Sequence, residues 1–452
     1  MSTPPRPAPG LAPAPTSLPP SLPPSLPTLA VRDVPADELA AFLQPALTAL
    51  GVPPIPERIE QTKTLPELAL RLSASDGERA VGAAGSYHFE LSIPGGEPAP
   101  EADPDPACVR LGIAGLTMVG VLPTHRRRGV LTALMRRHLD EARRSGRPLS
   151  ALFASEGGIY RRFGYGMASL CAEAELDPAR AAFAPAAPLP ARERIRLTLL
   201  DEDEAAAVLP PIWDRVRARR PGLLSRSEAW WRLRRIGDPP WTRAGRMPLQ
   251  RVLLELDGRP AAYALYRLSD SGWDSANLST LSADVLEALG DGPEATAALW
   301  RYLIELDLVR TLRARLLPLD HPLLFLLAEG RRLRLRTFDG LWLRLVDVEA
   351  ALRARGYPAA PPLVLEIEDP FCPWNQGRYR IAAQGSRADV ARTDAEPALR
   401  LPVEALGSVY LGGFRFTQLA AAGCVTELVP GALRHADRLF ATTQAPWAPE
   451  IF

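Results

Sequence analysis

The chain carries the same succession of expected elements twice: three strands, a helix and a further strand. The first copy runs from about residue 79 to 155 and the second from about residue 251 to 318, with little identity between them. In the second copy, two strands flank Asp257-Gly258, a dipeptide typical of a tight hairpin turn. In the first copy, small residues that alternate with β-branched ones favour a twisted antiparallel meander. This repetition predicts two mixed-sheet domains in tandem.

Two helical stretches are expected ahead of the first copy. One begins at Val31, is broken by Pro45 and ends near Gly51, and the other covers about residues 56–72. Residues 108–123 are expected to form two strands of the meander. The first domain would then consist of an N-terminal helical region followed by a sheet.

Composition divides the chain into four segments. A length of 452 residues suggests about three domains, and 47% apolar residues suffice for several cores. Residues 1–28 form a Pro/Ser/Ala/Leu tract, expected to be a disordered or polyproline-like tail, with a docking motif as the alternative. An Ala- and Pro-rich linker at residues 179–194 separates a first domain, 29–178, from a second, 179–345. The remainder, 346–452, shows an α+β pattern.

Composition also argues against several classes of protein. A balance of 53 basic and 52 acidic residues leaves a net charge of +1, which argues against a dedicated nucleic-acid binder. Four cysteines without a C-x-x-C pair and five histidines without H-E-x-x-H predict neither a disulfide scaffold nor a metal site. No run of about 18 apolar residues occurs, so no membrane span is expected. The first residues lack the continuous apolar stretch of a signal peptide, and a cytoplasmic protein is expected.

The densest chemical signal is a basic turn between a strand and a helix. A strand ends near Pro123, Arg126 to Gly129 follow, and a helix opens at once. The N-terminus of a helix presents unpaired N–H groups and the positive end of its dipole, which bind phosphate. Three arginines add charged donors, and Gly129 allows close approach of the backbone. The turn suits a pyrophosphate, although R-x-x-G by itself would rather favour an exposed basic cap.

The order of elements around this turn resembles the GNAT N-acetyltransferases, whose Q/R-x-x-G-x-G/A turn holds the pyrophosphate of acetyl-CoA. Leu131 replaces the last small residue, a change that the enhanced-intracellular-survival (Eis) subfamily tolerates. The Eis signature is similar to PTHRRRGVL at residues 123–131 and ASEGGIYRRFGYG at residues 154–166. RPGLLSR and Trp230-Trp231 resemble the family's central domain, and EDPFCPWNQGRYR and LGSVYLGG resemble its sterol-carrier-like domain.

The resemblance covers about residues 31–452 and implies an α/β (α+β) fold with two tandem GNAT-like domains before an α+β sterol-carrier-like domain. It implies Tyr160 as general acid and the C-terminal carboxylate of Phe452 as general base. Acetyl-CoA is the implied co-substrate, no metal is implied, and the family forms homohexamers. The implied cofactor contacts are a strand for the pantetheine arm, a turn for the pyrophosphate and an adjoining strand end: Val119, Gly120, Val121, Arg127, Arg128, Gly129, Val130, Leu131, Thr132, Ser155 and Glu156.

These residue types suit acetyl transfer to an amine. The amine must lose a proton before it attacks a thioester, and the leaving thiolate must gain one. A tyrosine can donate a proton at neutral pH, and a carboxylate can accept one. Without the family resemblance, Tyr160 would rather be an ordinary half-buried aromatic, Phe452 a frayed terminus and Glu156 a surface charge. If the carboxylate of Phe452 is not the base, Glu156 or Glu450 is the next candidate.

The acceptor stays open among an aminoglycoside, a protein lysine and another polyamine. Relatives often carry a histidine where this chain has Phe153. Glu57 and Glu60 are candidates for negative charge in a polyamine pocket. The second copy has Gly290-Asp291-Gly292 in place of the basic turn and is expected to be structural. The alternative from another class is a non-catalytic protein that binds a lipid or a partner and uses the GNAT fold as a scaffold.

Overall fold

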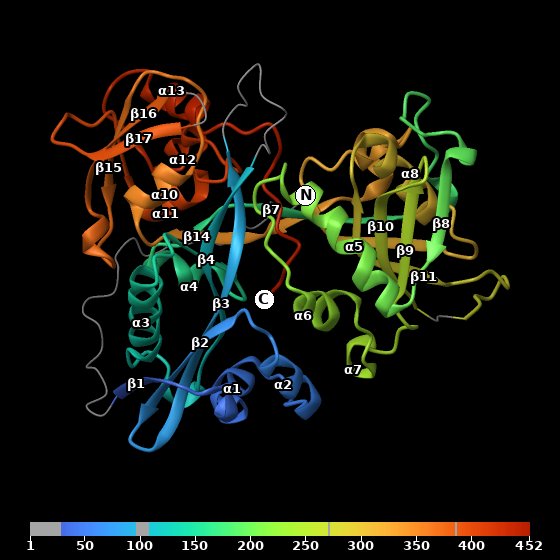
Figure 1. The fold of residues 1–452 in the computed structure, drawn as a ribbon, viewed down its shortest axis with the longest axis horizontal. Coiled ribbons are helices and arrows are strands. Elements are labelled where there is room, and N and C mark those ends of the chain that lie inside the picture. Colours follow the sequence, from blue (N-terminus) through green and yellow to red (C-terminus); the bar gives the residue numbers. More distant parts are fainter. Residues whose placement is uncertain (1–28, 96–107, 270–271, 385–386) are drawn as a thin grey trace, which may run out of the picture.

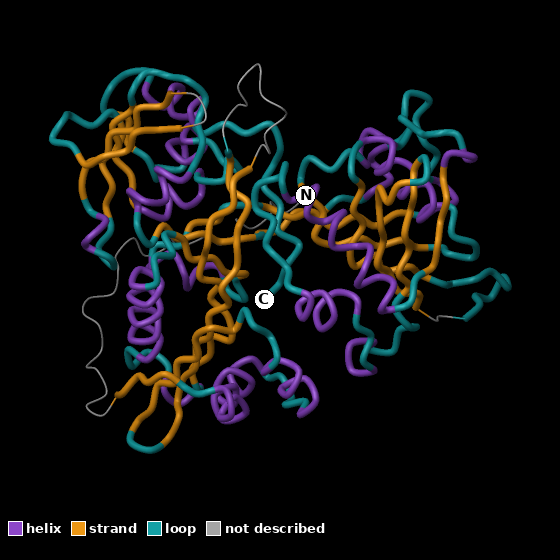
Figure 2. The backbone as a smooth tube through the Cα atoms, in the orientation of Figure 1, coloured by secondary structure: helices purple, strands orange, loops and turns teal. Residues whose placement is uncertain are grey.

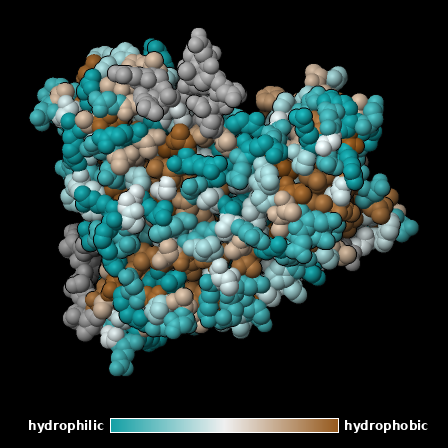
Figure 3. Space-filling view, viewed as in Figure 1, coloured by the Kyte–Doolittle hydropathy of each residue, from teal (hydrophilic) through white to brown (hydrophobic). Residues whose placement is uncertain are grey.

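The computed structural model describes residues 29–95, 108–269, 272–384 and 387–452, so the expected tail at residues 1–28 lies outside the described residues. Figure 1 shows a central sheet, a second sheet to its right and a third domain, in orange and red, at the upper left. The C-terminus lies in the middle, between the two sheets. On the face drawn in Figure 3, hydrophilic residues predominate and apolar ones form separate patches. Among the described residues, no helix has the length and apolar character to cross a membrane.

The central sheet has seven strands in the order β1-β2-β3-β4-β5-β14-β6. β1 to β4 form an antiparallel meander, whereas β4 and β5 are parallel. The strands are β1 (Leu29–Asp33), β2 (Leu68–Asp76), β3 (Arg79–Pro94), β4 (Cys108–Val121), β5 (Leu149–Phe153), β14 (Leu341–Leu345) and β6 (Gly166–Met167). The helices of this part are α1 (Leu39–Leu50), α2 (Pro56–Lys63), α3 (Val130–Arg144) and α4 (Gly157–Tyr160).

The second sheet also has seven strands, in the order β13-β7-β12-β11-β10-β9-β8. They are β7 (Leu170–Leu176), β8 (Ile195–Leu199), β9 (Gln250–Leu256), β10 (Arg259–Ser269), β11 (Ser282–Gly290), β12 (Thr311–Pro318) and β13 (Arg336–Asp339). The helices around it are α5 (Glu202–Arg217), α6 (Glu228–Trp230), α7 (Pro240–Arg243), α8 (Pro293–Ile304) and α9 (Leu323–Leu326). Both central residues of the β9–β10 turn, Asp257 and Gly258, have positive φ, which confirms the expected tight hairpin.

The third domain contains a five-stranded sheet in the order β17-β16-β15-β18-β19. Its strands are β15 (Leu363–Glu368), β16 (Gly377–Gln384), β17 (Arg387–Arg392), β18 (Leu399–Pro402) and β19 (Thr426–Glu427). Its helices are α10 (Val348–Ala354), α11 (Val403–Val409), α12 (Phe416–Ala421) and α13 (Ala432–Leu439). Figure 2 shows this sheet and its helices as a separate layered unit, so the third part has the expected α+β character.

The two larger sheets exchange strands. β7 precedes the boundary expected at residue 179, yet it pairs with β12 and β13 of the second sheet. β14 precedes the boundary expected at residue 346, yet it pairs with β5 and β6 of the central sheet. Each sheet is therefore completed by chain from the other side of a boundary, which ties the two domains together.

The N-terminal expectations are wrong in three places. Val31 lies in β1, which pairs with β2, and α1 passes through Pro45 without a break because the ring is buried against the core. Helix α2 ends at Lys63, and residues 68–76 form β2, in which apolar residues recur at every second position.

A fourth error concerns the strands of the meander. Residues 108–121 form one strand, not two, because a bulge at Met118, with φ of 52°, absorbs the irregularity without ending the pairing with β3. The repeated order is therefore β2-β3-β4-α3-β5 in the first copy and β9-β10-β11-α8-β12 in the second.

Candidate active site

The central sheet opens at the junction between β4 and β5. The two strands pair only along Ile113–Gly115 and Leu149–Ala151. Beyond this point, β4 continues to Val121, whereas β5 continues alongside β14. Within the described residues, no strand pairs with that edge of residues 116–121. Their backbone N–H and C=O groups on this side are therefore available to an extended ligand.

A cavity of about 390 Å³ lies at this opening. Its walls come from β4, the ends of α1, β5 and α4, β13 of the second sheet, and the last two residues of the chain. They are formed by Leu50, Leu116, Thr117, Met118, Val119, Phe153, Ala154, Ser155, Tyr160, Phe338, Asp339, Ile451 and Phe452. Of the residues expected in the site, Val119, Ser155, Tyr160 and Phe452 meet here.

Tyr160 lies at the end of α4, with only 7% of its surface exposed. Its ring is edge-on to that of Tyr165, with 6.1 Å between centroids. The Tyr165 hydroxyl is held by a 2.7 Å hydrogen bond with Ser150. Burial, followed by the negative charge of Glu156, raises the pKa of Tyr160 to about 12. The hydroxyl is therefore protonated at neutral pH and is able to donate a proton.

The C-terminal residue is docked, not frayed. The Phe452 ring packs edge-on against Phe89 and Tyr87, with centroid distances of 5.2 Å and 6.4 Å. Gly115, the last residue of β4 that pairs with β5, makes room for this ring, because a Cβ there would lie 3.0 Å from it. The terminal residue is thereby fixed where the two strands part.

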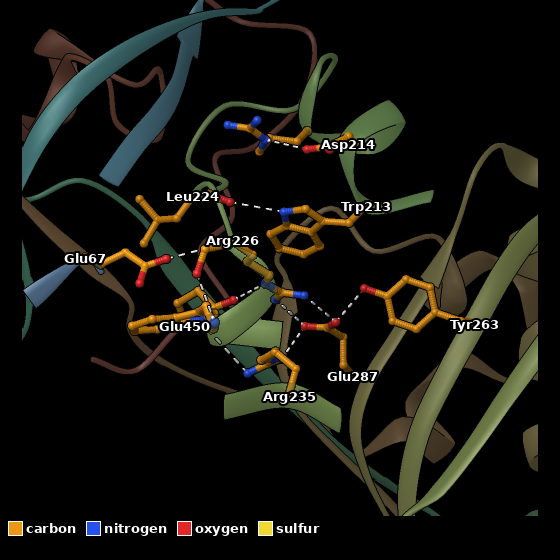
Figure 4. Close-up of polar contacts among 12 residues, drawn as sticks. Glu67, Trp213, Asp214, Leu224, Arg226, Arg235, Tyr263, Glu287 and Glu450 are labelled. Carbon is orange, nitrogen blue, oxygen red and sulfur yellow. Dashed lines mark hydrogen bonds and ion pairs between the residues drawn. The ribbon is translucent and has the colours of Figure 1, made fainter. Parts of the chain in front are cut away.

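A buried ion-pair network holds the chain just before this terminus, as Figure 4 shows. Arg226 pairs with Glu287 at 2.7 Å and with Glu450, and Arg235 contacts the same two carboxylates. Trp230 donates its indole N–H to Glu450 at 3.2 Å. The side chains of Arg226 and Glu287 are fully buried, and that of Glu450 is 2% exposed. The Glu450 carboxylate is buried and engaged by Arg226, Arg235 and Trp230, and it does not line the cavity of Tyr160. Its position therefore argues against Glu450 as the base.

The charges of the network complement one another. Burial by itself would raise the pKa of Glu287, but the charges of Arg226 and Arg235 outweigh burial and lower the pKa to about 2. The Arg226 guanidinium also lies over the Trp213 ring, 3.4 Å from its centroid. Trp231 is buried in the same region, which agrees with a packing role for this tryptophan. Side chains of the second domain thus supply the partners that fix the C-terminus in the first.

The basic turn forms a cradle beside the opening of the sheet. Arg127 and Gly129 have positive φ values of 60° and 83°, and α3 begins at Val130. Arg126, Arg127 and Arg128 are exposed, and within the described chain none of these three forms an ion pair. A Cβ at Gly129 would meet no atom within 4 Å, so the space beside it is open. Free helical N–H groups, unpaired arginines and an open glycine fit a pyrophosphate.

The other positions expected along β4 have a second, structural constraint. Gly120 faces α1, and a Cβ there would lie 2.4 Å from the Cα atom of Ala46. Val121 pairs with Gly82 of β3 on the closed side of the strand. A glycine at position 120 is therefore needed for the close approach of α1, whatever contact the backbone makes with a ligand.

The remaining expected residues lie around the cradle and the cavity. Val130 is buried, and Leu131 and Thr132 are half-buried on the first turn of α3. Ser155 lines the cavity, whereas Glu156 is exposed at the start of α4 and is not part of the cavity wall. Glu156 acts on the site through its charge, which raises the pKa of Tyr160.

Two residues of the cavity wall have no signal in the sequence. Phe338 and Asp339 belong to β13 of the second sheet and reach the site only because the two sheets exchange strands. Asp339 accepts a 2.7 Å hydrogen bond from the indole N–H of Trp342 in β14. No motif surrounds these positions, so only the fold identifies them. Among the described residues, no cluster of metal-ligating side chains occurs.

Three family models match successive parts of the chain. An acetyltransferase (GNAT) domain matches residues 30–168, and a second acetyltransferase (GNAT) domain model matches residues 222–345. A sterol carrier protein domain matches residues 348–449. The order of these matches agrees with the three parts of the fold.

Similar proteins span nearly the whole chain. An uncharacterized N-acetyltransferase of Streptomyces avermitilis is 42% identical over 89% of this chain and 94% of its own length. The N-acetyltransferase Eis of Mycobacterium bovis is 35% identical over 83% of this chain and 86% of its own length. The crystal structure of Eis1 from Mycobacterium abscessus superposes with a TM-score of 0.78 at 34% identity, covering 94% of this chain and 100% of that one.

Proposed function

The chain belongs to the Eis family of GNAT N-acetyltransferases, and from this membership we propose that it transfers acetyl from acetyl-CoA to a primary amine by direct attack. The observation that carries the proposal is that Tyr160 and the C-terminal Phe452 line one cavity at the opening between β4 and β5. An acid and a base at one place suit this reaction, in which the nucleophile loses a proton and the leaving group gains one. No covalent enzyme intermediate is required.

Acetyl-CoA supplies the activated acetyl group as a thioester. The open edge of β4 at Val119–Val121 suits the amide groups of the pantetheine arm, which need partners for their N–H and C=O groups. The cradle of Arg127, Arg128 and Gly129, with the first turn of α3, suits the pyrophosphate. Ser155 and Glu156 lie in the short connection between β5 and α4, the helix that ends at Tyr160.

Tyr160 and the terminal carboxylate divide the proton transfers. The acceptor nitrogen bonds to the acetyl carbon as the carbon–sulfur bond breaks. The carboxylate of Phe452 takes the amine proton, and Tyr160 gives its proton to the thiolate. The high pKa of Tyr160, caused by burial and then by Glu156, keeps the proton on the hydroxyl until the thiolate forms.

We propose a polyamine-type acceptor, either an aminoglycoside-like molecule or a lysine side chain. Asp339 supports this, because it is the acidic side chain of the cavity wall and attracts an ammonium group. A homohexamer, implied by the family resemblance, and a cytoplasmic location, expected from the sequence composition, stay predictions. Light scattering that gives a monomer mass at micromolar concentration would contradict the hexamer.

Amine-dependent release of free CoA thiol from acetyl-CoA tests the proposal. We expect thiol release when spermidine, an aminoglycoside or a lysine peptide is added, and little release without an amine. Absence of thiol with each of these amines would contradict the proposal and favour the non-catalytic scaffold instead.

A further inference from the structure

A second cavity lies next to the one that contains Tyr160, between the first and second domains. It has a volume of about 260 Å³, and its walls come from α2 and from the segment that follows α6. Two of its side chains are the arginines Arg58 and Arg234. The other walls include Ile55, Leu233 and Trp241, which are apolar, and Gln61 and Thr62, which are polar.

The two arginines of this cavity have no acidic partner among the described residues. Arg58 forms no ion pair, and Arg234 donates a 3.0 Å hydrogen bond to the neutral hydroxyl of Tyr87. Neighbouring arginines differ: Arg232 pairs with Asp203 and Glu228, and Arg235 with Glu287 and Glu450. Of these three neighbouring arginines, Arg234 lines the cavity and is the one that has no acidic partner in the described chain.

The two guanidinium groups also influence each other. Burial lowers the pKa of Arg58, and the positive charge of Arg234 lowers it further. The carboxylate of Glu67 acts on Tyr87; it is buried, accepts a 3.2 Å hydrogen bond from the backbone N–H of Ser227, and forms no ion pair with either arginine in the described chain. Two like charges that share one cavity are stabilised by an anion between them.

The acidic residues expected in this region do not face the cavity. Helix α2 presents Arg58, Gln61 and Thr62 to it, whereas Glu60 is paired with Lys63 at 2.6 Å, and Glu57 is exposed outside the cavity wall. The expectation that Glu57 and Glu60 give a polyamine pocket its negative charge is therefore wrong for this cavity, whose charge is positive.

The buried Tyr87 contacts one wall residue of each cavity, although it lines neither. The Tyr87 hydroxyl accepts the hydrogen bond from Arg234 in one cavity, and its ring packs edge-on against Phe452 in the other. The chain from the end of α1 to the start of α2 also borders both cavities, with Leu50 in the wall of the first and Ile55 in that of the second. One side chain, Tyr87, thus separates Arg234 from Phe452, which places the arginine pair close to the terminal residue.

On the premise of the proposed acetyl transfer, we infer that the second cavity is an acceptor subsite in which Arg58 and Arg234 bind an oxyanion, such as a carboxylate, carried by the amine substrate. Guanidinium groups bind carboxylates and phosphates through paired, charge-assisted hydrogen bonds. The apolar side chains of Ile55, Leu233 and Trp241 suit the carbon chain that joins amine and anion. Among the primary amines open to the proposed reaction, an ω-amino acid or a similar amine with a distal anion then fits this subsite better than the aminoglycoside-like polycation.

The test compares acceptors that differ only in their distal group. Thiol release is measured with 6-aminohexanoate, hexylamine and 1,6-diaminohexane, and again with the shorter and longer members of each series. We expect kcat/KM for the best amino acid to exceed that of its matched monoamine and diamine by about tenfold or more, the usual effect of a hydrogen bond between charged groups. A diamine that is used as well as, or better than, the amino acid at every length would contradict the inference.

Variants assign the preference to the arginine pair. Arg58→Glu should remove the preference for the amino acid and favour the diamine, and Arg58→Gln should leave the three acceptors nearly equal. Arg331→Glu, at an exposed arginine outside both cavities, makes the same charge change and should leave the preference intact. An unchanged preference in Arg58→Glu, with the fold intact by circular dichroism, would contradict the inference.

A binding measurement separates this inference from the proposed reaction. Hexanoate carries the anion but no amine, so its binding is measurable by calorimetry without acetyl-CoA. We expect binding to the wild type that Arg58→Glu weakens by about tenfold or more, whereas Arg331→Glu leaves it unchanged. Hexanoate binding without thiol release from any amine would contradict the proposed reaction alone, and equal binding to all three proteins would contradict the subsite. If free hexanoate activates hexylamine to the rate of 6-aminohexanoate, the anion is a separate activator, which would contradict a substrate-borne anion.

Discussion

The two GNAT domains begin their central helix in opposite ways. In the first, α3 follows Arg126 to Gly129, whose arginines are exposed and unpaired in the described chain. In the second, α8 follows Asp291 and Gly292, and the Asp291 carboxylate is already paired with Arg215, at 2.5 Å, and with Arg219. The first turn presents unpaired arginines at the N-terminus of α3, whereas the second carries the Asp291 carboxylate at the N-terminus of α8. The same fold thus has an unpaired basic turn in one copy, the pyrophosphate site of our proposal, and a turn neutralised by ion pairs in the other.

The strands beside these helices differ in the same way: β4 borders an open cavity, and β11 carries a carboxylate that is engaged by ion pairs. Beyond their parallel pairing, β4 of the first domain borders the cavity of Tyr160, whereas β11 of the second carries Glu287. Arg226, Arg235 and Tyr263 all contact this carboxylate. The region that would open to a cofactor is used to hold Arg226, which in turn holds Glu450. Side chains of the second domain therefore hold the C-terminal segment against the first domain.

Removal of the Tyr160 hydroxyl should have the largest effect on activity. Tyr160→Phe keeps the ring that packs against Tyr165 but removes the proton donor, and we expect kcat to fall by about 10²–10⁴-fold with little change in acetyl-CoA affinity. Tyr302→Phe removes a hydroxyl from α8 of the second domain and should leave kcat unchanged. Equal kcat for wild type and Tyr160→Phe, with chemistry rate-limiting, would remove Tyr160 from the mechanism.

Removal of the arginine that joins the domains should be next in size. Arg226→Met leaves Glu287 and Glu450 buried with only Arg235 as a cation, and we expect a loss of about 3–5 kcal/mol in the free energy of unfolding. Acetyl transfer should fall more than acetyl-CoA affinity, because the terminus is released while the basic turn is untouched. Arg215→Met breaks a more exposed pair in the same domain and serves as the control. Denaturant unfolding that shows equal losses for the two variants would contradict this role of Arg226.

A valine at the turn glycines tests which turn binds the cofactor. Gly129 and Gly292 both have positive φ, and a Cβ at either meets no atom within 4 Å. A valine is strained at both positions, and more so at Gly292, whose φ of 109° and ψ of 170° are essentially restricted to glycine. Gly129→Val should weaken acetyl-CoA binding by about 1–3 kcal/mol, because the side chain fills the space beside the helix N-terminus. Gly292→Val should not change this affinity in a calorimetric titration. Equal affinity for both variants would show that the basic turn is not the cofactor site.

The smallest effect is expected at Asp291. Asp291→Asn weakens two ion pairs whose arginines are 45% and 51% exposed, and we expect a loss of about 1 kcal/mol or less in the free energy of unfolding. Titration should still give one acetyl-CoA per chain, with unchanged kcat. If this variant bound a second acetyl-CoA, the charge of Asp291 alone would be what prevents the second domain from binding the cofactor.

The motifs predict the local parts of this site better than its assembly. The basic turn and its helix are encoded within about twenty consecutive residues, and they form as expected. Tyr160 and Phe452 share a cavity, but only the resemblance to a family brings them together before the fold is known. Local patterns carry no information on the partners of Arg226, which lie 61 and 224 positions away in sequence. For the same reason, the sequence does not predict that β7 and β14 pair with the other domain's sheet, nor that Asp339 lines the cavity.

The errors near the N-terminus have a different cause. Residues 68–76 alternate apolar and polar positions as a strand does, but the helical signal of α2 directly precedes them, and the two patterns merge when read in one direction. The sequence also does not identify Arg58 as a binding residue, because an arginine between two glutamates on an exposed helix normally indicates a solvated surface. Its importance depends on Arg234 of the second domain, which the fold brings to the same cavity.

The position of the terminal carboxylate tests the central claim most directly. One alanine added after Phe452 converts its carboxylate into a neutral amide and moves the new carboxylate about 3.5 Å away. The measurement is kcat for amine acetylation by this extended protein against the native terminus, with an alanine added at the N-terminus as control. We predict a fall in kcat of about 10²–10⁴-fold in the C-terminal extension, with unchanged acetyl-CoA affinity and no change in the control. Acetylation by the extended protein at the native rate would contradict the terminal carboxylate as base.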